Sequence, residues 1–141
     1  MLYVDTSVIV TPFLRNREPV VIERCLALLD DAAGRGIELA TSWLSWDEVA
    51  WSLGRKDGRF DRERAAEFAQ ALIEVEFLRF LEVDEQVIST ATRLLSETSA
   101  RPRDCIHAAT ALLHCGGQLV SLDSDFGKEK MAKHGLRLVD P

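Results

Sequence analysis

The sequence has few of the residues that mark zinc-thiolate, disulfide-rich or membrane proteins. Its three cysteines, Cys25, Cys105 and Cys115, are odd in number, and their spacing fits neither a zinc site nor a disulfide framework. Its three histidines are widely separated, so an imidazole zinc site is not expected. No apolar run approaches the roughly 20 residues that a membrane-spanning helix needs, and no basic leader of a signal peptide precedes the first strand. We therefore expect a protein of a reducing, cytoplasmic compartment with buried cysteines and no membrane contact.

An excess of positive charge is also missing. The formal net charge is −6, from 23 acidic residues against 17 lysines and arginines. This balance argues against binding nucleic acid by bulk charge, although it leaves room for an acidic metal pocket that acts on nucleic acid locally. Neither G-x-S-x-G nor a P-loop occurs, so serine hydrolases and P-loop NTPases lack their motifs here. The 141 residues, 47% of them hydrophobic, suit one globular domain over residues 1–141.

Strand-like and helix-like segments alternate along the chain. Short apolar runs predict strands at residues 2–5, 37–40, 77–83, 118–122 and 136–139. Helical spacing of apolar residues predicts helices at about 6–14, 19–34, 45–53, 61–76, 84–97, 103–115 and 124–134. Strands that alternate with helices form βαβ units, so we predict an α/β fold with a mostly parallel sheet.

Carboxylates stand at the places where these elements begin and end. Asp5 and Asp123 terminate two apolar strands, Glu48 and Asp104 lie in the first turns of helices, and Asp125 follows Asp123 by two residues. Strand ends and helix starts meet at one rim of a parallel sheet, so these five side chains are expected together. Carboxylates that converge repel one another, and a hard divalent cation such as Mg²⁺ or Mn²⁺ relieves that repulsion.

Structural roles compete with this interpretation at two of the acids. Asp5 is equally well explained as the N-cap of the following helix. Ser45 and Glu48 have the spacing of a capping box, and the neighbouring Asp47 is an alternative to Glu48 as the acid of this segment.

For histidine, tryptophan and arginine residues close to these acids in the sequence, a structural role and a functional role are also both possible. His107, one turn after Asp104, is favoured as a hydrogen-bonded packing residue of an apolar helix. The helical spacing of the three tryptophans favours core or dimer packing over stacking on bases, and Trp43 and Trp46 are expected on the buried face of their helix. Arg101 and Arg103 flank Asp104 and are weighed equally as solvated surface and as contacts for an RNA backbone.

Four segments carry a family resemblance: MLYVDTSVIV, TSWLSWDEV, RDCIHAATAL and LVSLDSDF. In this order, and across nearly the whole chain, they resemble the four acidic motifs of the PIN-domain ribonucleases, and they are most similar to the VapC toxins of toxin–antitoxin pairs. The D-T-S start, the D-x-x-x-A-A-T-A centre and the D-x-D-F end are specific in combination.

The resemblance implies a fold, a site and an activity. It implies one PIN-like domain with a five-stranded parallel sheet and helices on both sides, a homodimer, and a partner antitoxin that blocks the site. It assigns Asp5, Glu48, Asp104 and Asp123 to a Mg²⁺ or Mn²⁺ site, with Asp125 as an auxiliary acid and with Ser7 and Ser121 in support. The implied reaction is endonucleolytic cleavage of RNA by metal-activated water, leaving a 5′-phosphate and a 3′-hydroxyl.

Two other functions remain open from the sequence. A Mg²⁺-dependent phospho-acceptor domain also uses acids at strand ends, but it normally has an acidic pair at the first strand and a lysine at the last. Here the first strand offers Asp5 alone, and Lys128 lies on a helix beyond Asp125. The other alternative is a PIN-like module that binds RNA or protein without catalysis.

Overall fold

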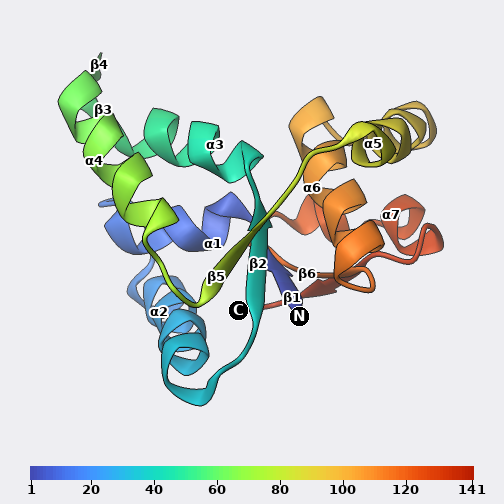
Figure 1. Cartoon of the computed structure of the whole chain (residues 1–141), viewed down its shortest axis with the longest axis horizontal. Coiled ribbons are helices and arrows are strands. Elements are labelled where there is room, and N and C mark those ends of the chain that lie inside the picture. Colours follow the sequence, from blue (N-terminus) through green and yellow to red (C-terminus); the bar gives the residue numbers. More distant parts are fainter.

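The computed structural model describes residues 1–141 and has a five-stranded sheet at its centre (Figure 1). Its strands are β1 (Leu2–Val4), β2 (Leu39–Ser42), β5 (Leu78–Leu81), β6 (Gln118–Val120) and β7 (Arg137–Val139). They lie in the order β5-β2-β1-β6-β7, and every neighbouring pair is parallel. The predicted α/β class, with about five mostly parallel strands, is confirmed.

Successive strand residues enter two separate hydrophobic cores, because side chains alternate across a sheet. In β1, Tyr3 joins one core and Val4 joins the other. The neighbouring strands alternate in step, since Tyr3 is in register with Ala40 of β2 and with Leu119 of β6. Both faces of the sheet are therefore covered, which suits the near-continuous apolar strands of the sequence.

Helices cover the two faces (Figure 1). One face carries α1 (Thr6–Val10), α2 (Pro19–Arg35), α3 (Leu44–Leu53) and α4 (Arg62–Ile73), and the other carries α5 (Glu85–Glu97), α6 (Pro102–His114) and α7 (Glu129–Lys133). Two short 3-10 segments, Thr11–Phe13 and Ser124–Gly127, and a small hairpin of β3 (Arg55–Lys56) and β4 (Arg59–Phe60) complete the chain. None of the helices combines the length and the apolar character needed to cross a bilayer.

Some element boundaries differ from the prediction for local reasons. The helix expected at 6–14 ends at Val10 and continues as a 3-10 turn containing Pro12, which has no N–H to donate into a helix. The strand expected at 37–40 instead covers Leu39–Ser42, because Thr41 and Ser42 pair with Phe80 and Leu81 of β5. Because of this pairing with β5, the strand lies two residues further along the chain than predicted.

The connections of the sheet reverse direction between β1 and β6. From β1 the chain proceeds outward through β2 to β5, and it then returns to place β6 on the other side of β1, followed by β7. Such a reversal opens a crevice at the carboxyl ends of the two central strands, where α/β proteins bind ligands. Asp5 follows β1 and Asp123 follows β6, so the two strand-ending acids flank this crevice.

Candidate active site

Asp5 is the N-cap of α1, and one of its carboxylate oxygens accepts all of the side chain's hydrogen bonds at this helix start. Its Oδ2 accepts hydrogen bonds from the backbone N–H of Ser7 (3.4 Å), the Ser7 hydroxyl (2.6 Å) and the Ser121 hydroxyl (2.7 Å). The other oxygen, Oδ1, has no such partner and lies 3.7 Å from His107 Nε2. The sequence left two roles open for Asp5, capping the helix and forming part of the site. Asp5 has both roles, because Oδ2 accepts the hydrogen bonds at the start of α1 while Oδ1 faces the site.

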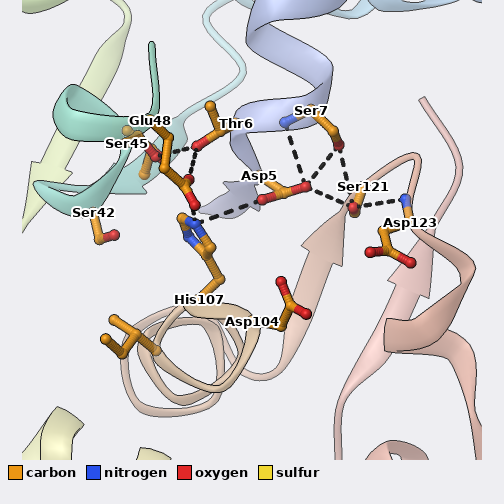
Figure 2. Close-up of polar contacts among 12 residues, drawn as sticks. Asp5, Thr6, Ser7, Ser42, Ser45, Glu48, Asp104, His107, Ser121 and Asp123 are labelled. Carbon is orange, nitrogen blue, oxygen red and sulfur yellow. Dashed lines mark hydrogen bonds and ion pairs between the residues drawn. The ribbon is translucent and has the colours of Figure 1, made fainter. Parts of the chain in front are cut away.

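Ser7 and Ser121 connect the ends of the two central strands. While each hydroxyl donates to Asp5, the Ser7 oxygen accepts the backbone N–H of Leu122 (3.1 Å) and the Ser121 oxygen accepts that of Asp123 (3.0 Å). The two hydroxyl oxygens are 3.3 Å apart. This network of hydroxyl groups fixes Oδ2 of Asp5 against the end of β6 (Figure 2).

Glu48 reaches the site from the second turn of α3. Its Oε2 accepts a hydrogen bond from the Thr6 hydroxyl (2.6 Å) and lies 2.8 Å from His107 Nε2. The capping box proposed for Ser45 and Glu48 is wrong, since Trp43 is the N-cap and makes no side-chain capping bond. Ser45 lies inside the helix, and its buried hydroxyl is instead bonded to those of Thr6 and Thr41.

Asp47 points away from the centre of the site. Its carboxylate is 3.1 Å from the guanidinium of Arg103, and both side chains are more than half exposed. Of the two adjacent acids, Glu48 is the one that the fold brings to Asp5.

His107 is the site residue that sequence reasoning missed. It is 1% exposed on α6, as expected of a packing histidine, but its Nδ1 is 2.6 Å from the Tyr3 hydroxyl and its Nε2 is 2.8 Å from Glu48. Ligand atoms of Asp5, Glu48 and His107 all lie within 4.8 Å of one another. The available signal was its place three residues after Asp104, which puts both side chains on one helix face.

Charge pairing shifts the pKa values of Glu48 and His107 in opposite directions. Burial alone raises the pKa of Glu48, but hydrogen bonds from His107 and Thr6 and nearby positive charge bring it below its ordinary value. Burial alone lowers the pKa of His107, but its hydrogen bond to Glu48 and the charges of Asp5, Glu48 and Asp104 raise it above its ordinary value. The two groups thus stabilise each other in the charged state.

Asp104 and Asp123 share an arginine. Arg101 Nε donates to Asp104 Oδ2 (2.9 Å), and its Nη2 donates to Asp123 Oδ2 (3.3 Å). Asp104 also accepts the backbone N–H of Arg101 (3.3 Å) at the start of α6. Glu48 and Asp104 line one open depression, together with Arg101, Pro102 and Arg103.

Asp125 lies at the margin of this group. Its backbone N–H donates to Asp123 Oδ1 (2.9 Å), while its carboxylate pairs with Lys128 at 2.7 Å. The hydrogen bond and charge of Lys128 lower the pKa of the Asp125 carboxyl. The structure thus gathers Asp5, Glu48, Asp104 and Asp123, as Figure 2 shows, and leaves Asp125 facing a lysine.

The chemistry of this donor set fits a hard divalent cation. Four carboxylates from four segments face one region, and oxygen ligands are those that Mg²⁺ and Mn²⁺ prefer. Arg101 already sets a positive charge between Asp104 and Asp123, which indicates that this part of the site favours a cation.

The tryptophans near the site are more exposed than predicted. Trp43, Trp46 and Trp51 are 43%, 47% and 52% exposed, so the buried face expected for α3 at Trp43 and Trp46 is wrong. The helix turns Ser45, Val49 and Leu53 inward instead. Trp43 stacks on Phe80 at 4.6 Å between ring centroids, and Trp51 stacks on Phe60 at 5.4 Å.

A parallel sheet with acids gathered at its topological switch point defines an α/β domain with an acidic site, whose oxygen donors suit a cation. The family model of the PIN domain matches residues 2–130, and the chain belongs to the PIN-domain family. This match favours the nuclease prediction over the phospho-acceptor alternative. No curated protein sequence matches the chain significantly.

Several solved structures share this fold. VapC20 of Mycobacterium tuberculosis, described as a toxin that cleaves the sarcin–ricin loop, superposes with a TM-score of 0.73 at 21% identity, covering 100% of both chains. VapBC2 of Rickettsia felis, bound to a promoter DNA fragment, gives 0.71 at 14% identity over 99% of this chain and 98% of that one. FitAB bound to a DNA fragment gives 0.68 at 19% identity over 99% and 94%.

Proposed function

We propose that this chain is a divalent-metal-dependent endoribonuclease and the toxin of a toxin–antitoxin pair. The observation that supports it most is the convergence of Asp5, Glu48, Asp104 and Asp123 at the switch point of a PIN fold. The structurally similar VapC20 is named as an RNA-cleaving toxin, which is consistent with the same reaction class. A PIN-like module that binds RNA or protein without cutting it is the competing hypothesis.

Each site residue has a proposed role. Asp5, Asp104 and Asp123 would hold Mg²⁺ or Mn²⁺, with Asp125 as an auxiliary ligand and Glu48 completing the site. When bound, the cation would supply the charge that activates a water molecule and offsets charge building up on the phosphate. Ser7 and Ser121 hold Asp5 so that Oδ1 stays free toward the site. No side-chain nucleophile is required.

Arg101 and Arg103 are the proposed contacts for the RNA backbone. Both line the depression that contains Glu48 and Asp104, and both side chains are more than half exposed. Guanidinium groups bind phosphate through paired hydrogen bonds, so they can place a scissile phosphate beside the acids despite the net charge of −6.

An antitoxin partner and a homodimer in the cytoplasm are part of the same proposal. A toxin–antitoxin complex of Klebsiella pneumoniae shares the fold, as do VapBC2 and FitAB, which are bound to DNA fragments. A short open reading frame for a small DNA-binding protein next to this gene would identify the partner. Co-purification of the two chains would test their association, and light scattering of the isolated chain would test the homodimer.

The decisive experiment is RNA cleavage by the purified protein. Mixed cellular RNA is incubated with Mg²⁺ or Mn²⁺, with parallel samples containing EDTA or the Asp104→Asn variant. Cleavage that requires metal and is lost in the variant supports the nuclease. If folded RNAs, including ribosomal RNA, stay intact and calorimetry detects no metal binding, the catalytic proposal is wrong and the binding module is favoured.

A further inference from the structure

The buried Tyr3–His107 pair is the part of the site that the proposed catalytic roles leave unused. Tyr3 is fully buried in β1, and its hydroxyl accepts the backbone N–H of Ser42 at 3.1 Å. A backbone N–H can only donate, so the phenol's own hydrogen must go elsewhere. The other hydrogen bond of this phenol is the 2.6 Å contact to His107 Nδ1. Burial also raises the pKa of Tyr3, which keeps the phenol protonated.

This arrangement determines where the imidazole carries hydrogen. When neutral His107 accepts the phenol hydrogen at Nδ1, its single N–H is at Nε2. When His107 is protonated, both nitrogens carry hydrogen, so Nδ1 donates to the phenol oxygen and the phenol hydrogen turns to another acceptor. The remaining tautomer would turn a lone pair of Nε2 toward the carboxylate of Glu48 at 2.8 Å, which is repulsive. Nε2 therefore carries a hydrogen in either protonation state and donates it to Glu48.

We propose that Tyr3 and His107 are positioning residues that hold Glu48 with a single oxygen, Oε1, free for the site, and that His107 is not a metal ligand. His107 and Thr6 both donate to Oε2 of Glu48, which occupies that oxygen from two sides. A nitrogen that carries hydrogen has no lone pair for a metal, even though Asp5, Glu48 and His107 lie within ligand distance of one another.

The consequence for the reaction is a fixed direction for Glu48. A glutamate side chain on a helix has several accessible rotamers, and a buried donor network selects one of them. Partners of this kind typically change metal affinity or activity by about 10–100-fold when they are removed. The kinetic part of this inference rests on the proposed nuclease function, whereas the hydrogen position and the metal ligation do not.

The first test is nitrogen NMR of the full chain labelled at its histidine rings, with and without saturating Mg²⁺. The chain has three histidines, and the signal of His107 is identified by its loss in His107→Gln. We expect hydrogen on Nε2 in both samples. In Tyr3→Phe the Nδ1 signal should move because its phenol partner is lost, while Nε2 keeps its hydrogen opposite Glu48. An Nε2 without hydrogen, or one that binds metal directly, overturns the proposal whether or not the protein cuts RNA.

The second test separates the donor from the packing. Gln at position 107 can place an amide N–H near the position of Nε2, whereas the shorter Asn reaches only the position of Nδ1. His107→Gln should keep kcat within about fivefold of wild type, and His107→Asn should lower it about 10–100-fold with little change in KM for RNA. Equal losses in two folded variants would refute the donor role.

A buried neighbour on the same helix supplies the control. Thr110 is fully buried one turn after His107, and its hydroxyl bonds only to the Ile106 carbonyl (2.8 Å). Thr110→Val should lower the melting temperature without changing kcat. If it lowers kcat as far as His107→Asn does, the effect at position 107 is packing, and the positioning role is wrong.

Discussion

The site has an inner half and an outer half that are built differently. In the inner half, Asp5 and Glu48 are held by neutral hydroxyls and a buried histidine, and their side chains are 11% and 17% exposed. In the outer half, Asp123 and Asp125 are paired with the exposed cations Arg101 and Lys128, and their side chains are 30% and 44% exposed. Asp104 lies between the halves at 14%, paired with Arg101.

The difference is that the inner half has a preorganised geometry, whereas the outer half has partners that can be exchanged. Buried hydrogen-bond networks are costly to disturb and keep one geometry. Exposed ion pairs contribute little and are readily replaced, so Arg101 and Lys128 can release the acids to a metal ion and bind phosphate instead. The inner half therefore defines the geometry of the site, and the outer half adapts to what binds.

The largest expected effect is at the centre of the inner half. Asp5→Asn keeps the shape of the side chain but removes its charge and gives it an amide donor. We expect RNA cleavage to fall by about a thousandfold, an effect typical of losing a group that stabilises charge at the reaction centre. Initial rates at saturating Mn²⁺ measure this, with circular dichroism as the check of folding.

Asp125→Asn is the matched change in the outer half. Its partner Lys128 is exposed, so we expect a rate within about twofold of wild type. If the two substitutions had equal effects, the distinction between the halves would be lost, and Asp125 would be a principal metal ligand like Asp5 instead of an auxiliary one.

The hydroxyls around Asp5 should have the next largest effect. Ser7→Ala with Ser121→Ala leaves Oδ2 of Asp5 buried with only the weak contact to the Ser7 backbone N–H. We expect Mn²⁺ affinity to fall by about 10–100-fold and the free energy of unfolding by about 1–3 kcal/mol. Calorimetry and urea unfolding measure the two quantities. The exposed Ser96→Ala, whose hydroxyl bonds to the Arg93 carbonyl, should change neither. Unaltered metal affinity in the double variant would contradict the role of the serines.

Much of the fold and the outline of the site were predictable from local pattern. Apolar runs that stop at Asp5 and Asp123 predict strands, and parallel strands bring their carboxyl ends to one edge, as observed. The helices predicted to start at 61 and 84 do so, with Asp61 and Asp84 as N-caps, because capping depends on residues within one turn.

The errors share a different cause, which is distance along the chain. The Ser45–Glu48 pair matched a local capping pattern. In the fold, however, Glu48 accepts a hydrogen bond from Thr6 and Ser45 is bonded to Thr41, and both threonines come from other segments of the chain. His107 is a buried, hydrogen-bonded residue as predicted, but its partners were missed because Tyr3 and Glu48 lie 104 and 59 residues away in the sequence. Trp43 and Trp46 were misplaced because the rotation of α3 about its axis depends on what the sheet presents to it.

Arg101 offers a smaller effect with opposite signs for two ligands. It is 74% exposed on its side chain and neutralises Asp104 and Asp123, so Arg101→Ala removes a competing positive charge. We expect Mn²⁺ to bind about two- to fivefold more tightly and the KM for RNA to rise by a similar factor. Isothermal calorimetry gives the first value and steady-state kinetics the second.

Arg103→Ala is the control for Arg101, since Arg103 pairs with Asp47 outside the acid cluster. It should raise the KM for RNA without changing the affinity for Mn²⁺. If metal binding responded equally to both substitutions, the effect would be one of general charge, and Arg101 would have no special relation to Asp104 and Asp123.

The smallest expected effect is a pH dependence of stability that comes from the inner half. Glu48 has a lowered pKa in the folded protein, so its contribution is present above its ordinary value of 4.5 and is lost as pH falls through the folded value. His107 has a raised pKa, so its contribution is present below its ordinary value of 6.5 and is lost as pH rises through the folded value. Between pH 4.5 and 6.5 both contributions hold. In EDTA, the melting temperature of wild type should therefore exceed that of Glu48→Gln by a few degrees in this window. This difference in melting temperature should become smaller at lower and at higher pH. The control is Glu129→Gln, which breaks only the exposed pair with Lys133 and should lower the melting temperature slightly and equally at every pH. If the melting-temperature difference for Glu48→Gln were also the same at every pH, the Glu48–His107 pair would not be charged in the folded protein.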